Sequence, residues 1–260
     1  MGLRNFKLLF NAAVVALTFA AASAYGEYTC QDVPQLRSIL ANLERDCGAT
    51  GPGVCKAKGI GSDNVSGAIN ACVAYWGNNY RHECGANVVC AGKSFYKSKG
   101  YAGDSVGQAI SGCIAYWGSN YQHECTANVT GENAGAFPKA KGYAGDTVSA
   151  AVTACVAYWG SNYTHECTAN VTSENSFRFA KAKGYAGDTV SNAIDACVSY
   201  WGGNYRHECG ANVTSVGGLV VCRAKGYAGD SASAAVDRCV AYWGSNYRVE
   251  CQQNVSCGSN

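Results

Sequence analysis

The chain has 260 residues, a formal net charge of +2 and 16 cysteines. A nearly even charge balance gives no electrostatic basis for binding nucleic acid or an anionic membrane. The even number of cysteines favours disulfide bonds, and therefore an oxidising compartment over a reducing one.

Residues 1–24 are predicted to be a secretory signal peptide. Arg4 and Lys7 form a short basic stretch, residues 8–21 are almost wholly apolar, and residues 22–24 read Ala-Ser-Ala, which suits a cleavage site. An uncleaved membrane anchor is less favoured because the apolar run is short for a span. Cleavage would leave 18 basic and 18 acidic residues, and no second long apolar run follows. We therefore expect an extracytoplasmic protein without a membrane span: secreted, or periplasmic or on the cell surface if the source is bacterial.

Residues 25–54 are predicted to form an N-terminal half-repeat that caps the fold. Cys30 and Cys47 lie 17 residues apart, which is also the separation of Cys55 and Cys72 in the repeat that follows. This shared spacing indicates that the half-repeat is closed by its own disulfide.

The rest of the chain consists of five similar blocks. Their tryptophans follow one another at steps of 41, 42, 42 and 42 residues: Trp76, Trp117, Trp159, Trp201 and Trp243. The predicted repeats are residues 55–95, 96–136, 137–178, 179–220 and 221–260. A period of this length is typical of one supersecondary unit stacked on itself, and it favours a scaffold or a repeated binding surface over one asymmetric active site.

The third repeat shows the expected helices. Apolar residues recur at steps of four, three and four between residues 148 and 159, and Asp146 precedes them as an N-cap, so a helix is predicted over 146–159. Tyr163, Cys167 and Val171 lie four apart and predict the inner face of a second, shorter helix.

The stretch 173–184 joins this helical pair to the next repeat. Its lysines before Gly184 fit a helix C-terminus, so we expect a loop with at most two helical turns. The predicted fold is therefore all-α, a solenoid of disulfide-stapled αα-hairpins with five repeats of about 42 residues and an N-terminal half-repeat. At the level of architecture it resembles disulfide-stapled αα-solenoids such as the Sel1-like cysteine-rich proteins. Their consensus is not present in this chain, so the resemblance assigns no functional residue.

The cysteine spacing predicts eight disulfides, because one scheme uses every cysteine and repeats its own intervals. The pairs are Cys30–Cys47, Cys55–Cys90, Cys72–Cys84, Cys113–Cys125, Cys155–Cys167, Cys197–Cys209, Cys222–Cys257 and Cys239–Cys251. The two pairs that are 35 residues apart are expected to staple the first and last repeats. A zinc site is the less favoured alternative.

All four histidines of the chain lie in copies of the tripeptide His-Glu-Cys. They are His82, His123, His165 and His207. His and Cys could together ligate a soft metal. A structural role is favoured because each of these cysteines has a disulfide partner at a fixed spacing and the last repeat has Val249 in place of His. We therefore expect no metal, no cofactor and no catalytic residue.

Two sets of polar residues are candidates for binding. The first set is Asn162, Glu166 and Asn170, which recur at equivalent positions in all five repeats. This polar row predicts a hydrogen-bond ladder between repeats. Alternatively, it forms a carbohydrate-binding face together with Tyr158 and Tyr163. The second set varies between repeats and is expected to face outward as the binding surface: Arg81, Gln122, Thr164, Arg206 and Arg248. The residues four positions later are expected to face outward too: Gly85, Thr126, Thr168, Gly210 and Gln252.

These patterns predict an exported, non-enzymatic repeat protein that acts as a binding or structural scaffold. The expected partner is another protein or a cell surface. The alternative is a carbohydrate-binding repeat module that uses the face with Tyr, Asn and Glu side chains.

Overall fold

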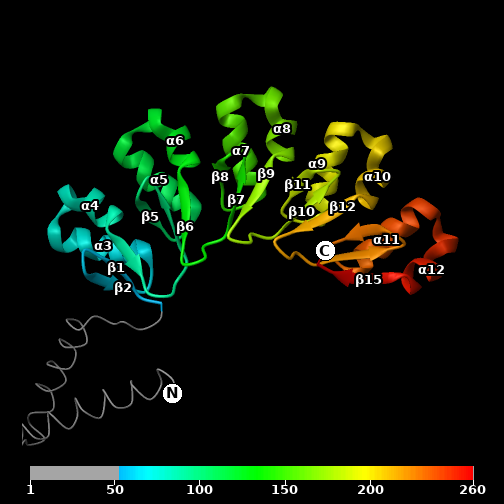
Figure 1. The fold of residues 1–260 in the computed structure, drawn as a ribbon, viewed down its shortest axis with the longest axis horizontal. Helices are drawn as coiled ribbons and strands as arrows, with labels where there is room; N and C mark the ends of the chain where they lie inside the picture. The colour runs from blue at the N-terminus through cyan, green and yellow to red at the C-terminus, as the bar shows by residue number, and fades with distance from the viewer. Residues whose placement is uncertain (1–52, 260) are drawn as a thin grey trace, which may run out of the picture. The chain divides into compact units, whose positions relative to one another are not determined.

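The computed structural model describes residues 53–259, which form five consecutive units of similar structure (Figure 1). The predicted signal peptide and almost all of the predicted half-repeat, including Cys30 and Cys47, lie outside these residues. No helix among the described residues is long and apolar enough to cross a membrane.

Each unit has the order strand, strand, helix, one 3₁₀ turn, helix, strand. The opening strands are β1 (Cys55–Ala57), β4 (Phe95–Ser98), β7 (Phe137–Ala140), β10 (Phe179–Ala182) and β13 (Val221–Ala224). Their hairpin partners are β2 (Ile60–Ser62), β5 (Tyr101–Gly103), β8 (Tyr143–Ala144), β11 (Tyr185–Gly187) and β14 (Tyr227–Gly229). The closing strands are β3 (Val88–Cys90), β6 (Val129–Glu132), β9 (Val171–Glu174), β12 (Val213–Val216) and β15 (Val255–Gly258).

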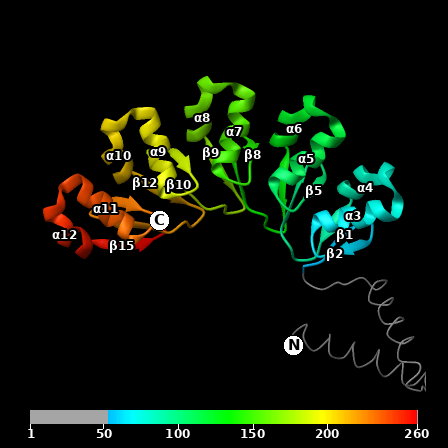
Figure 2. The same cartoon turned by 180° about the vertical axis from the view of Figure 1, so that it is seen from behind.

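Two helices lie between the second and third strands of each unit. The first helices are α3 (Val65–Trp76), α5 (Val106–Trp117), α7 (Val148–Trp159), α9 (Val190–Trp201) and α11 (Ala232–Trp243). The second helices are α4 (Arg81–Ala86), α6 (Gln122–Ala127), α8 (Thr164–Ala169), α10 (Arg206–Ala211) and α12 (Arg248–Gln253). The first helix packs on the strands and the second packs on the first, so the two lie together beside their sheet (Figure 2).

The opening strand is the middle strand of a three-stranded antiparallel sheet in every unit. In the third unit Ala140 pairs with Tyr143 on one side and with Val171 on the other. The all-α prediction is therefore wrong, because the described residues hold five such sheets. The stretch 173–184, expected as a loop, contains the end of β9 and all of β10.

Local backbone geometry explains why these segments are strands. The second helix ends at Ala169 and Asn170 is its C-cap, so Val171 begins a strand instead of continuing the helix. Lys141 and Gly142 join β7 to β8 with φ angles of 45° and 91°. Two positive φ values are the mark of a type I′ hairpin turn, and this turn replaces the helix C-terminus that the Lys-Gly pair suggested.

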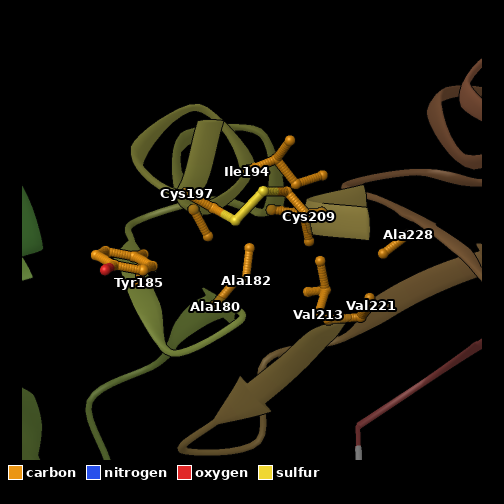
Figure 3. Close-up of a cluster of buried hydrophobic side chains, with 11 residues drawn as sticks. Ala180, Ala182, Tyr185, Ile194, Cys197, Cys209, Val213, Val221 and Ala228 are labelled. Carbon is orange, nitrogen blue, oxygen red and sulfur yellow. A yellow bond between two sulfur atoms is a disulfide. The ribbon is translucent and has the colours of Figure 1, made fainter. Parts of the chain in front are cut away.

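The core of the fourth unit shows how each small unit is stabilised (Figure 3). Ala182 from the sheet packs with Ile194 from the first helix and with the disulfide between Cys197 and Cys209, and all of these side chains are at most 2% exposed. Val221 and Ala228 of the fifth unit belong to the same cluster. The first four units therefore complete their cores with side chains of the following unit, as expected for a repeat that cannot bury its apolar face alone.

Seven disulfides are present in residues 53–259, and they join the same cysteines that the spacing paired. Five of them link the two helices within a unit across 12 residues. The other two, Cys55–Cys90 and Cys222–Cys257, each link the opening and closing strands of an end unit, where the two cysteines face each other in register.

Candidate functional site

Each unit exposes a group of four side chains that we call the aromatic cluster. In the third unit, the Trp159 ring at the end of α7 lies 5.8 Å from the Tyr163 ring. The Lys141 ammonium lies 4.8 Å from the centre of the Trp159 ring and 5.3 Å from that of Tyr163, within the range of a cation–π contact. Its Nζ also donates to a carboxylate oxygen of Glu166 at 2.8 Å. One lysine thus holds both rings and the carboxylate in place.

The same cluster occurs in all five units, because the hairpin turn, the helix end and the second helix recur in the same positions. Its members are Lys58, Trp76, Tyr80 and Glu83; Lys99, Trp117, Tyr121 and Glu124; Lys183, Trp201, Tyr205 and Glu208; and Lys225, Trp243, Tyr247 and Glu250, besides the four of the third unit. The tryptophans are 44–46% exposed and the tyrosines 38–40%. Each unit therefore presents two large rings to solvent in a fixed orientation.

In the first four units the lysine lowers the pKa of the cluster carboxyl. The hydrogen bond from the lysine is the largest influence on Glu166, and it holds the pKa of this carboxyl below its ordinary value against the opposing effect of burial. Glu83, Glu124 and Glu208 are shifted in the same direction by the same cause.

The predicted polar row of Asn162, Glu166 and Asn170 does not form a ladder between repeats. The Asn170 side-chain amide donates to the Glu166 carbonyl at 2.8 Å, within its own helix, and its backbone carbonyl accepts from the amide of Lys141. Asn162 lies exposed in the 3₁₀ turn before α8. Asn170 therefore ends a helix and fixes the hairpin turn that carries Lys141.

The histidines of the His-Glu-Cys tripeptides connect neighbouring units. His165 stacks on Tyr200 of the fourth unit at 5.0 Å, and Tyr185 packs on the same ring at 5.1 Å. The other three histidines make the same contact: His82 with Tyr116, His123 with Tyr158, and His207 with Tyr242. The fifth unit carries the exposed Val249 at this position. Among residues 53–259, no group of three or more His, Cys, Asp or Glu is arranged to hold a metal ion.

A second link between units is an aspartate that caps the helix of the preceding unit. Asp146 was expected to cap its own helix, but it accepts hydrogen bonds from the amides of Val106 at 2.6 Å and Gly107 at 3.0 Å, at the start of α5. The cap of α7 is Thr147 instead, which accepts from the amide of Ala150. Asp104, Asp188 and Asp230 cap α3, α7 and α9 in the same way.

We expect the link between the first and second units to weaken in acid. Burial raises the pKa of Asp104, but hydrogen bonds from the amides of Ser66 and Val65 outweigh this effect and hold the pKa below its ordinary value. A carboxyl with a depressed native pKa contributes stability above its unfolded pKa of about 4, and this stability is lost as the pH falls through the lower native value.

The protection factors of the α3 amides, which compare the observed exchange rate with the intrinsic rate at the same pH, should therefore fall as the pH is lowered from about 5 to about 2. The matched variant Asp104→Asn should remove much of this pH dependence. An equal fall of the protection factors in the variant would contradict the assignment.

The five outward positions of the predicted binding surface are exposed: Arg81, Gln122, Thr164, Arg206 and Arg248. Each is the first residue of its second helix. The positions four residues later are not outward, since Thr126 and Thr168 are 6% and 8% exposed and their hydroxyls donate to carbonyls of their own helices. Gly85 and Gly210 are buried at the same place, where an added Cβ would meet Tyr101 at 3.4 Å and Tyr227 at 3.7 Å. Gln252 is exposed in the fifth unit.

The structure thus defines a cysteine-rich repeat protein whose units are joined by aromatic stacking and shared helix caps. Seven disulfides among the described residues indicate an extracellular, oxidising environment. No protein-family model, curated protein or solved structure matches the chain.

Proposed function

We propose that the chain is an exported, non-enzymatic scaffold that binds another protein or a surface through its aromatic clusters. The observation that carries the proposal is the half-exposed tryptophan of each unit, which the turn lysine holds beside a half-exposed tyrosine. Trp and Tyr are enriched among residues that dominate protein interfaces. Because the rings are already ordered, binding through them costs little side-chain entropy.

Repetition supports a multivalent mode of binding. Five equivalent clusters on one chain allow several weak contacts to act together, which raises avidity without any strong single contact. The exposed residues Arg81, Gln122, Thr164, Arg206 and Arg248 begin the second helices that carry the cluster glutamates. Their variation between units would adjust each contact, while the cluster itself stays constant.

A carbohydrate polymer is the second candidate ligand. Each cluster places aromatic rings beside an ion pair, and the exposed amide of Asn162 lies in the same 3₁₀ turn as Tyr163. Such rings pack on the C–H face of a sugar while amides and carboxylates bond to its hydroxyl groups. Binding of the full chain to a glycan array, together with capture from the extracellular fraction of the producing organism, separates this candidate from a protein partner.

Replacing Trp117, Trp159 and Trp201 by Ala together is expected to weaken binding to the captured partner or glycan by about 100-fold, because three of five contacts are lost. Surface plasmon resonance on the immobilised ligand would measure the change. The matched control replaces Thr130, Thr172 and Thr214, exposed residues of β6, β9 and β12 in the same three units, by Ala. A folded tryptophan variant that binds as well as the control would rule out the aromatic clusters as the site.

A further inference from the structure

The five units are not identical where they meet, and one junction holds a sizeable groove. Between the first and second units a cavity of about 730 Å³ is lined by both first helices, by α4 and by β5. The polar side chains of its lining include Asn70, Asn78, Arg81, His82, Gln108 and Ser111. The volume lies within the range of small-molecule sites.

Gly112 keeps this groove open. Its equivalent in the fifth unit is Arg238, which fills the junction with the fourth unit by donating to the Ala228 carbonyl at 2.6 Å and the Ser191 hydroxyl at 2.8 Å. The cavity at that junction is only about 270 Å³. Because Gly112 has no side chain, the space that the arginine occupies in one junction is free in the other.

A second difference leaves a positive charge available in the open groove. In the fourth unit, Arg206 pairs with the carboxylate of Asp195 at 3.4 Å. Asn70 is the equivalent of Asp195 in the first unit, and Arg81, the equivalent of Arg206, has no ion pair among the residues that the structure describes. The lining of the groove includes no carboxylate. An arginine in this setting favours an anionic group of a ligand.

The remaining polar groups of the groove suit hydroxyl groups. The Gln108 carbonyl oxygen already accepts from the amide of Asp104, so its NH₂ group is left as a donor. Asn70 and Asn78 contribute amides that both donate and accept, and Ser111 contributes a hydroxyl. Ile69, Ala102 and Ala115 supply apolar wall between them.

We propose that the groove between the first and second units binds an acidic sugar of one or two units, with its carboxylate at Arg81 and its hydroxyl groups at the surrounding amides. This site goes beyond the aromatic clusters, because it depends on Gly112 and Asn70, which differ between units, and not on the tryptophans, which are the same in all.

Isothermal titration calorimetry of the full chain with glucuronate and with glucose tests the proposal, since these two probes differ in the carboxylate. Glucuronate is expected to bind with one site per chain and about tenfold more tightly than glucose. Equal affinities would overturn the role of Arg81, and the absence of glucuronate binding up to about 10 mM would overturn the site.

Two variants test the site directly, because each introduces into the groove a residue found at the junction of the fourth and fifth units. Gly112→Arg is expected to abolish binding, because the Ser66 hydroxyl and the Ala102 carbonyl stand where the partners of Arg238 stand. Asn70→Asp is expected to weaken glucuronate much more than glucose and so to remove the tenfold preference, because the new carboxylate neutralises Arg81 while its oxygens still accept hydrogen bonds from sugar hydroxyl groups. Asn70 is exposed, so this variant keeps the test decisive if Gly112→Arg does not fold.

The matched controls place the same changes in the third unit, as Ala154→Arg and Thr153→Asp. They are expected to leave glucuronate binding unchanged. Loss of binding in these controls, or its retention in folded Gly112→Arg, would show that the ligand binds elsewhere and would overturn the proposal. The tryptophan variants replace none of the residues that line the groove, so the failure of one proposal is distinguishable from failure of the other.

Discussion

Replacing Cys222 and Cys257 together by Ala is expected to destabilise the fifth unit by about 4 kcal/mol, the chain-entropy value for a 35-residue loop. This bridge is the covalent link between β13 and β15, and the unit it closes packs against only one neighbour among the described residues. Hydrogen exchange followed by mass spectrometry should show fast exchange in residues 221–258 and unchanged protection in the second and third units.

The variant Cys55→Ala with Cys90→Ala is the matched control at the other end. It removes a bridge of the same separation and should loosen β1 and β3 without affecting the fifth unit. A uniform loss of protection along residues 53–259 in either variant would contradict local stabilisation, and it would indicate that the five units unfold as one.

Replacing Asp188 by Ala is expected to cost about 2 kcal/mol, which is the upper end for loss of a helix cap, because the carboxylate also joins two units. Its oxygens accept from the amides of Val148 at 2.6 Å and Ser149 at 3.3 Å. Without the carboxylate the start of α7 loses a charge-assisted partner and the third unit loses a link to the fourth. Urea unfolding should show a lower midpoint.

Asp63→Ala is the control for this prediction. Asp63 occupies the same position in the first unit but caps no helix within residues 53–259, so its replacement removes no cap between the described units and should cost less than that of Asp188. Asp188→Asn should lie between the two, since the amide oxygen still accepts a hydrogen bond but carries no charge. If Asp188→Ala and Asp63→Ala cost the same, the cap between units does not contribute to stability.

The repeat units, their first helices and their disulfide pairs could be predicted from the sequence. The tryptophan steps define the units, and the apolar spacing that predicts a helix over 146–159 agrees with α7 (Val148–Trp159) to within two residues. The cysteine intervals pair the seven bridges because each pair recurs at a fixed separation. These inferences succeed because each rests on a pattern that the chain repeats: the tryptophans and the 12-residue cysteine pairs occur five times and the 35-residue cysteine pairs twice.

The strands could not be predicted in the same way because they are only two to four residues long. Too few residues alternate in Phe179–Ala182 for a period of two to be visible. The turn before β11 uses Lys183 at a φ of 46°, although type I′ turns usually carry Asn or Asp there. A lysine before a glycine therefore suggested the end of a helix, and this interpretation also hid the aromatic cluster that the lysine organises.

The contacts between units could not be assigned because they join residues about 35 to 40 positions apart. Asp146 and Thr147 are adjacent and both are good helix caps, so the sequence cannot tell which of them serves the local helix. One signal was present: the only unit that lacks the tripeptide histidine is the last one. Read together with the tyrosine that precedes each tryptophan, Val249 could have suggested that His165 stacks on the next unit.

The aspartate caps give the array a direction. Each of these four aspartates accepts hydrogen bonds from the amides that begin the first helix of the preceding unit, as Asp230 does for α9. Truncation is therefore unequal at the two ends: deleting the fifth unit would leave α9 without this carboxylate, whereas deleting the first would free Asp104 and leave α5 capped by Asp146. A shortened chain should tolerate loss from its N-terminal side better, so successive units would be removed most safely in the order in which they are synthesised.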